Sequence, residues 1–308
     1  MFAEFNPAKR LDSVVDLKIV PGFADRFKAA VVNADPFVIY THEAQADGAA
    51  AAVVTEYLVR LAGETNRVPR LRGFVMGAAR SMVDGQQGRK LQVAYHVFNL
   101  LFSARGLKVY PFTREEDVAQ YRMSRDNLLS ELRPMVKKMK QGYPPAILAT
   151  GSVEGGRHDR GCDPEDIHGL QRLTDDDILT MARKLKKVNG DREIVLILVG
   201  LHGGFRLQSP NRDKRYVTKE GLATFLGLPE RFIPHTKMEA SVGTIIGGNQ
   251  MVDRFGRDWM KADKDKDEVR RKQRVQEIND FIMGHAALLI PPHARGAYSH
   301  AIELLTPS

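Results

Sequence analysis

The chain has 308 residues, of which 43% are hydrophobic and 27% are charged, a composition typical of a globular protein with a buried core. Its apolar runs are no longer than strands, and its first residues lack the apolar stretch of a secretory signal, so neither a membrane-spanning nor a secreted protein is expected. The single cysteine, Cys162, excludes an intramolecular disulfide and fits a reducing compartment. We therefore expect a cytoplasmic protein.

The formal net charge of +8 predicts a surface that attracts anions such as nucleic acid, anionic lipid or an acidic protein. The basic residues are spread along the chain in short runs, for example at residues 184–187, which are typical of the solvated face of a helix. Aromatic residues make up only 7% of the chain and do not alternate with the basic runs. Because no surface for stacking bases is indicated, nucleic acid is not expected as a partner.

Strand and helix patterns alternate along the first half of the chain. Residues 11–30 are amphipathic and interrupted at Pro21-Gly22, which predicts a helical leader within residues 1–35. The apolar run 36–41 then predicts a strand, and the alanine-rich run 49–61 predicts a buried helix. The expected elements that follow are a strand at 71–76, a helix at 86–104, a strand at 107–112 and helical patterns across 115–140.

The alternation continues in the second half. Residues 146–149 predict a fourth strand, and the aspartates at 175–177 predict the start of a helix that runs to Lys187, with acids at its beginning and bases at its end. Residues 193–199 predict a fifth strand, and the charged residues 258–277 predict an exposed helix. This order predicts one α/β domain over residues 36–308, with a mixed, mainly parallel sheet flanked by helices.

Two polar clusters follow predicted strands a little over a hundred residues apart. His42 and Asp47 follow the strand at 36–41, and residues 154–160 follow the strand at 146–149. In open α/β sheets, ligands bind beyond the carboxyl ends of the strands. Both clusters are therefore expected at one edge of the sheet, where a base and an anion-binding loop could act on one substrate.

His42 and Asp47 have the residue types and spacing of a base with its orienting carboxylate. A carboxylate five positions on, across a strand-to-helix turn, can reach back to the imidazole Nδ1, which fixes the tautomer and leaves Nε2 for a substrate. The alternative is that His42 caps the helix and that Asp47 supplies a negative charge to its first turn. The spacing alone does not separate these interpretations.

The second cluster has the residues of a phosphate-binding loop. Gly155 and Gly156 allow the backbone to approach a ligand closely, and Arg157 and Arg160 can bind a phosphate through bidentate hydrogen bonds. Arg114 follows another predicted strand and can join this anion site, and residues 73–80 can line it. The alternative is a glycine-rich surface loop whose arginines pair with nearby aspartates.

These motifs together resemble the glycerolipid acyltransferase family, in which the soluble, plastid-type glycerol-3-phosphate acyltransferases are the most similar branch. The family block H-x-x-x-x-D is matched by His42 and Asp47, its glycine–apolar–arginine block by residues 106–114, and its Glu-Gly-x-Arg core by residues 154–157. Residues 155–160 also resemble the Gly-Gly-Arg-Asp-Arg segment of the plastid-type enzymes, with His158 as an additional residue. The resemblance covers residues 36–200, about half of the chain.

The resemblance implies an enzyme of phospholipid biosynthesis. It would move a fatty acyl group from acyl-CoA or acyl-carrier protein to a hydroxyl of glycerol-3-phosphate or lysophosphatidate. His42 would be the general base and Asp47 its orienter, with no metal or cofactor besides the acyl donor. The protein could also contact an anionic membrane peripherally. The substrate-binding residues implied by the resemblance are Arg114, Glu154, Gly155, Gly156, Arg157 and Arg160.

Two other functions remain open from the residues alone. A non-enzymatic basic protein could bind nucleic acid or an anionic membrane through its charge. An acyl hydrolase would release the acyl group to water, although Ser152 stands at the second position of residues 151–155 and so does not form a Gly-x-Ser-x-Gly elbow. Cys162, His158 and His168 lack the spacing of zinc ligands, so no metal site is expected.

Overall fold

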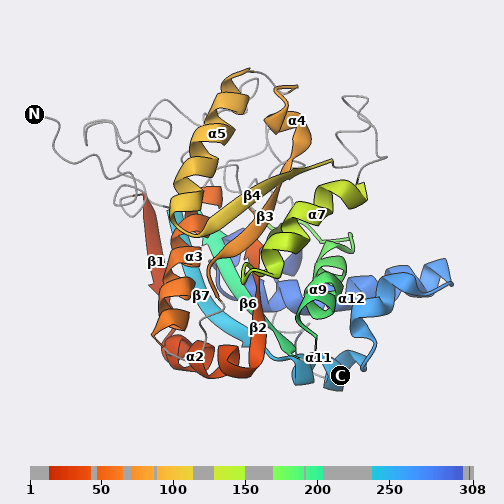
Figure 1. Ribbon diagram of the computed structural model, residues 1–308. Coiled ribbons are helices and arrows are strands. Elements are labelled where there is room, and N and C mark those ends of the chain that lie inside the picture. The colour runs from red at the N-terminus through yellow and green to blue at the C-terminus, as the bar shows by residue number, and fades with distance from the viewer. Residues whose placement is uncertain are drawn as a thin grey trace, which may run out of the picture.

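The computed structural model describes residues 14–42, 47–64, 71–86, 89–113, 128–149, 169–190, 192–203, 238–300 and 305. These residues form a single α/β fold in which a mixed, mostly parallel sheet is flanked by helices (Figure 1). The fold class predicted from the alternating patterns is therefore confirmed.

The main sheet contains five strands in the order β1-β7-β6-β2-β5. Strands β6, β2 and β5 are parallel to one another, whereas β7 is antiparallel to β6 and parallel to β1. Because parallel strands end on the same side, the carboxyl ends of β6, β2 and β5 form one edge, here called the carboxyl edge. The strand bounds are β1 Val15–Ile19, β2 Ala34–Thr41, β5 Ala146–Ala149, β6 Glu193–His202 and β7 Met238–Ile246.

A second sheet pairs β3 (Phe74–Ala79) in parallel with β4 (Leu107–Phe112). It is joined to the chain just before β5, because Val75 forms a parallel bridge with Pro145 and its N–H donates to the carbonyl of Pro144 at 2.9 Å. Strands β3 and β4 therefore continue the order of the main sheet beyond β5 and run in the same direction. Their carboxyl ends also lie toward the carboxyl edge.

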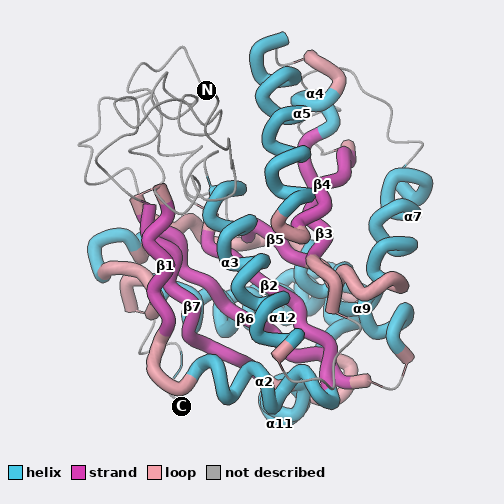
Figure 2. Tube along the Cα trace, turned by 60° about the vertical axis from the view of Figure 1, so that its left-hand side comes forward, coloured by secondary structure: helices cyan, strands magenta, loops and turns pink. Residues whose placement is uncertain are grey.

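Helices cover both faces of the sheet. Helices α2 and α3 pack on one face, and α9 and α12 pack on the other (Figure 1). Figure 2 shows α5 and α7 on opposite sides of the β3–β4 pair. The helix bounds are α2 Phe23–Asn33, α3 Asp47–Gly63, α4 Arg80–Val83, α5 Arg89–Ala104, α7 Leu128–Met139, α9 Asp177–Asn189, α11 Gly248–Phe255 and α12 Glu268–Ala287, with 3-10 turns at Trp259–Lys264, Pro292–Ala294 and Gly296–Tyr298.

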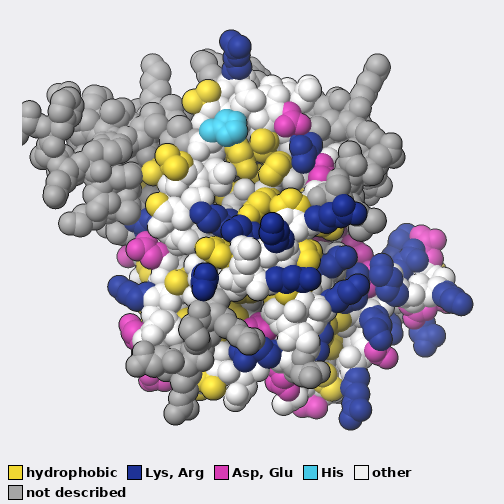
Figure 3. Space-filling model, viewed as in Figure 1, with side chains coloured by type: hydrophobic (Ala, Val, Ile, Leu, Met, Phe, Trp, Pro, Cys, Tyr) yellow, Lys and Arg dark blue, Asp and Glu magenta, His cyan; other side chains and the backbone are white. Residues whose placement is uncertain are grey.

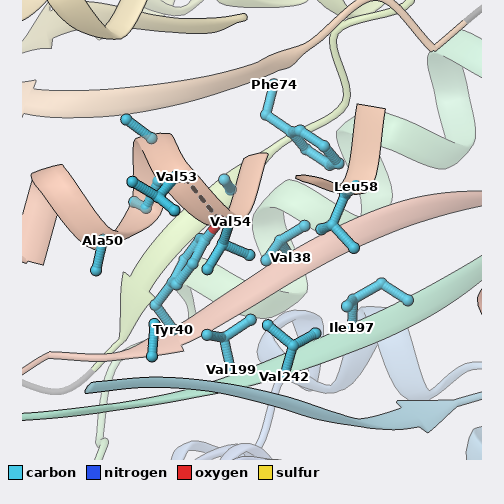
Figure 4. Close-up of a cluster of buried hydrophobic side chains, with 14 of the residues drawn as sticks. Val38, Tyr40, Ala50, Val53, Val54, Leu58, Phe74, Ile197, Val199 and Val242 are labelled. Atoms are coloured by element: carbon cyan, nitrogen blue, oxygen red, sulfur yellow. Dashed lines mark hydrogen bonds between the residues drawn. The ribbon is translucent and has the colours of Figure 1, made fainter. Parts of the chain in front are cut away.

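The period-two alternation of β2 divides its apolar side chains between two buried clusters. Val38 and Tyr40 pack with Val54 and Leu58 of α3 (Figure 4), while Phe37 and Ile39 face α9 and α12. Each large apolar side chain buried in this way stabilises the fold by roughly 1.5–3 kcal/mol. The packing holds the end of β2 against the start of α3, which are the two elements that carry the first polar cluster.

The Tyr40 hydroxyl adds a polar tie between β2 and α3. It is fully buried and donates a hydrogen bond to the carbonyl of Ala51 at 3.3 Å (Figure 4). Burial raises the pKa of the Tyr40 phenol, so the hydroxyl stays protonated and remains a donor. The tie satisfies a polar group that would otherwise be costly to bury.

The prediction of a helical leader is wrong for Val15–Ile19, which form β1 and pair with β7. The helix begins only at Phe23, after Gly22 with a φ of 75°. The side chains of β1 alternate between buried and exposed positions, a period-two pattern that had been grouped with the 3.6-residue pattern of α2. A boundary at residue 35 would also fall inside β2.

Other predicted elements agree with the structure to different degrees. The strands at 107–112 and 146–149 have the predicted bounds, whereas the strand expected at 71–76 is shifted to Phe74–Ala79. Strand β7 was not predicted. The helix expected at 258–277 is instead a 3-10 turn followed by α12, which is largely buried from Val275 onward.

Candidate functional site

The site forms around His42, the residue that directly follows β2. Its Nδ1 lies 3.0 Å from Oδ2 of Asp47, the first residue of α3. The Asp47 side chain is fully buried, and 23% of the His42 side chain is exposed. The structure therefore brings together the base and the orienting carboxylate that the sequence predicted.

The contact determines the tautomer of the imidazole. A carboxylate only accepts hydrogen bonds, so Nδ1 of His42 carries the proton and donates to Asp47. In the neutral ring, Nε2 is then the basic nitrogen. Asp47 also places a negative charge in the first turn of α3, where the helix dipole stabilises it. The two interpretations of Asp47 are thus compatible in the folded chain.

Backbone contacts on both sides hold the end of β2. The His42 N–H donates to the carbonyl of Ala149, the last residue of β5, at 3.0 Å. On the other side, the Leu201 N–H in β6 donates to the buried Thr41 hydroxyl at 2.7 Å. His42 is therefore placed by three neighbouring strands, and the chain leaves β5 beside it at the carboxyl edge.

The predicted anion-binding residues lie outside the described part of the chain. The description of β4 ends at Thr113, one residue before Arg114, and the description of β5 ends at Ala149. Their position relative to His42 stays a prediction. The residues concerned are Arg114, Glu154, Gly155, Gly156, Arg157 and Arg160.

A second polar group lies where β3 and β4 end. Glu131 of α7 accepts a hydrogen bond from Nε of Arg80 at 2.6 Å, and it accepts two from Thr113, from the hydroxyl and from the backbone N–H, each at 2.8 Å. Only 7% of the Glu131 side chain is exposed, against 30% of the Arg80 side chain. One buried carboxylate thus joins the ends of two strands and holds a partly exposed guanidinium.

Sequence reasoning missed Glu131 and Thr113 and considered Arg80 only as part of a stretch that lines the site. Glu131 is one acid among many in a helical pattern, and no local motif distinguishes it. Its partner Arg80 is 51 positions away. Only the packing of α7 on β3 and β4 brings the two together, so no short-range signal could have identified the pair.

A histidine also ends β6 at the carboxyl edge. His202 is buried, and its ring makes an edge-to-face contact with His293 at a centroid distance of 5.3 Å. Along β6, Val199 and Leu201 belong to the buried cluster that contains α3, whereas Leu198 belongs to the cluster on the opposite face. By this alternation His202 lies on the opposite face from His42, and it is not part of the His42 pair.

The described residues also line a hollow of about 570 Å³ at the opposite end of the strands. Asp35 at the start of β2 borders it, together with Arg72 and Asn189. Seven residues of extended chain separate Asp35 from His42, a length of about 23 Å at 3.3 Å per residue. The hollow is therefore separate from the His42 site.

Two structural searches bear on the wider classes of function. Within the described ranges, no three His, Cys, Asp or Glu side chains gather closely enough to hold a metal ion. None of the helices described is both long enough and apolar enough to cross a membrane.

Comparisons with known proteins complete the description of the site. Neither protein-family models nor curated proteins yield a match to this chain. The functional argument therefore depends on the geometry of the chain's own residues.

Proposed function

We propose that this protein is an O-acyltransferase that moves a fatty acyl group from an acyl thioester to a hydroxyl of a phosphorylated glycerol acceptor. The observation that carries the proposal is the 3.0 Å contact between His42 and the buried Asp47 at the carboxyl edge of a parallel sheet. This edge is where open α/β sheets bind ligands. The neighbouring strand β5 ends at the same place and leads into the residues that resemble the anion-binding block of glycerolipid acyltransferases.

In the proposed reaction, Nε2 of His42 takes the proton of the acceptor hydroxyl as its oxygen attacks the thioester carbonyl carbon. The tetrahedral intermediate then collapses, the carbon–sulfur bond breaks, and the leaving thiolate takes the proton from the imidazolium. Asp47 stabilises the cation while it exists and keeps the ring oriented. Proton transfer by a base placed in this way contributes on the order of 10²–10⁴-fold to the rate.

The phosphate of the acceptor is assigned to the arginines of the second cluster. Arg114, Arg157 and Arg160 would hold it by bidentate hydrogen bonds, and Glu154 would orient them. The backbone of Gly155-Gly156 could approach the ligand closely because neither residue has a side chain. Holding the acceptor by its phosphate would place the hydroxyl at His42 and convert binding energy into orientation.

Peripheral contact with an anionic membrane is part of the proposal. Helix α5 exposes two large apolar side chains on one face, Val93 at 61% and Leu100 at 73%. No acid occurs between Gly85 and Thr113, a segment that contains several basic residues. Figure 3 shows hydrophobic side chains over the upper half of this face, where α5 lies, above a band of Lys and Arg side chains.

A screen of donors and acceptors tests the proposal directly. Acyl-CoA and acyl-carrier protein would each be combined with glycerol-3-phosphate and with lysophosphatidate, and the acylated products would be separated by chromatography. Acylation of either acceptor supports the proposal. Release of the acyl group only as free fatty acid would indicate a hydrolase, and salt-sensitive binding to heparin without turnover would indicate a non-enzymatic anion-binding protein.

The His42→Ala variant tests the role of the base. We expect turnover to fall by on the order of 10²–10⁴-fold while the circular dichroism spectrum and the thermal unfolding midpoint remain those of the native protein. His285→Gln is the matched control, because His285 is another partly buried histidine and belongs to α12. Native turnover in His42→Ala would remove the residue from the chemistry.

A further inference from the structure

The hydrogen bonds of Glu131 leave most of the Arg80 guanidinium available. Arginine has five N–H donors, and Glu131 receives one of them, from Nε. The nearest other acid, Asp84, has its carboxylate oxygen 3.9 Å from Nη1, beyond hydrogen-bond distance. With its side chain 30% exposed, Arg80 presents terminal nitrogens toward solvent while Nε is held from behind.

The strand registers place Arg80 level with His42. Val38 of β2 is paired with Ala146, and Val75 of β3 is paired with Pro145 on the other side of the same chain segment. Counting five residues on from Val75 reaches Arg80, at the level of residue 150, and four on from Val38 reaches His42 at the same level. Two strand spacings of about 4.8 Å then separate the two backbones by about 10 Å.

We propose that Arg80 binds the phosphate of the acceptor, and that Glu131 is a positioning residue that acts through Arg80. This inference rests on the proposed function and adds a phosphate-binding residue from β3 that the sequence motifs do not include. A glycerol phosphate together with an extended arginine side chain can bridge the separation between Arg80 and His42. Arginine suits the task because its planar fork matches the oxygens of a phosphate.

The alternative is that Arg80 and Glu131 form a purely structural ion pair. A buried carboxylate needs a partner in either case, so the contact alone does not separate the two roles. Ligand binding separates them, since a structural pair would affect unfolding and leave the affinity for phosphate unchanged. The closing experiment therefore measures binding apart from catalysis.

The dissociation constants of glycerol-3-phosphate and of inorganic phosphate would be measured by calorimetry on the full chain, for the native protein and for Arg80→Gln. We expect Arg80→Gln to bind glycerol-3-phosphate about 10-fold more weakly or worse, the loss typical of a charge-assisted hydrogen bond. Arg80→Lys keeps the charge without the fork, and a smaller loss is expected. It also serves if Arg80→Gln fails to fold.

A double-mutant cycle tests whether Glu131 acts through Arg80. Glu131→Gln should also weaken binding, and the double variant Arg80→Gln with Glu131→Gln should be no weaker than Arg80→Gln alone. Losses that add fully would show that Glu131 does not act through Arg80. Glu56→Gln is the matched control, because it removes another Arg–Glu pair, with Arg105 at 2.9 Å, and should bind glycerol-3-phosphate like the native protein.

Several outcomes would overturn the assignment of Arg80. Native affinity in the folded Arg80→Gln and Arg80→Lys variants would do so, as would an equal loss in Glu56→Gln. A native protein that binds neither probe would also exclude it. By contrast, the expected pattern of binding without acyl transfer from either donor would keep Arg80 as an anion-binding residue and would reject only the acyltransferase reaction.

Discussion

The contact between His42 and Asp47 is local in the chain, since five positions separate the two residues. Strand β2 ends before His42 and helix α3 begins at Asp47, so the contact spans a strand-to-helix connection. A pattern of this kind can be recognised from residue types and spacing. The buried position of Asp47, which keeps water from weakening the contact, depends on the packing of α3 on the sheet.

The Asp47→Asn variant tests the tautomer at the scale of this contact. The asparagine amide can donate to Nδ1, which would move the ring proton to Nε2 and remove the basic nitrogen from the substrate side. We expect kcat to fall by on the order of 10²–10⁴-fold with little change in the KM of the acceptor. Steady-state kinetics at several acceptor concentrations would measure both constants.

Asp35→Asn is the control for the loss of a partly buried aspartate. Asp35 pairs with Arg192 at 3.0 Å at the opposite end of β2, so its replacement should leave kcat unchanged. An Asp47→Asn variant with the native kcat would show that the carboxylate only stabilises the first turn of α3.

At the scale of elements, helices α11 and α12 share a cluster of aromatic and charged side chains. The Arg254 guanidinium lies 4.7 Å from the ring centroid of Phe281, and Phe281 makes an edge-to-face contact with His285 at 4.8 Å. Burial, and then the positive charge of Arg254, lower the pKa of His285 below its ordinary value of 6.5. The folded protein therefore resists protonation of this imidazole.

This shift predicts a loss of stability in acid. Below pH 6.5 the His285 of the unfolded chain binds a proton that the folded chain resists, so the free energy of unfolding falls as the pH falls. His285→Gln removes this contribution. We expect the thermal unfolding midpoint of His285→Gln to decline less than that of the native protein from about pH 8 to about pH 5.

His96→Gln on α5 serves as the control, since His96 is exposed and its loss should leave the decline unchanged. If the native protein and His285→Gln declined in parallel, burial of His285 would not contribute to the acid sensitivity.

At the scale of the whole molecule, the net charge of +8 and the exposed face of α5 predict binding to anionic vesicles. Apolar side chains that enter the bilayer interface and basic residues attracted to anionic lipid act together in such contacts. We expect the protein to sediment with vesicles rich in phosphatidylglycerol and not with phosphatidylcholine vesicles. The double variant Val93→Ser with Leu100→Ser should bind several-fold more weakly.

Val269→Ser is the matched control, because Val269 is 76% exposed on α12, a helix with acids as well as bases on its surface. Its replacement should not change vesicle binding. Equal binding of the double variant and the native protein would exclude the face of α5 as the contact surface.

Sequence by itself determined the fold class and the His42–Asp47 pair, because both depend on short-range patterns: the alternation of strand and helix periods, and a carboxylate within reach of an imidazole across one turn. It misassigned β1 and missed β7, the two strands that run against the others, since a period of two residues does not reveal which neighbour a strand pairs with.

Only the tertiary structure decided which strand ends lie side by side. The order β6-β2-β5 places Ala149 next to His42, and the packing of α7 brings Glu131 to Arg80 and Thr113. Such contacts join residues far apart in the chain, and they form because burying both faces of the sheet favours one arrangement of strands and helices over the others. That energy belongs to the assembled core, and no single segment of the chain encodes it.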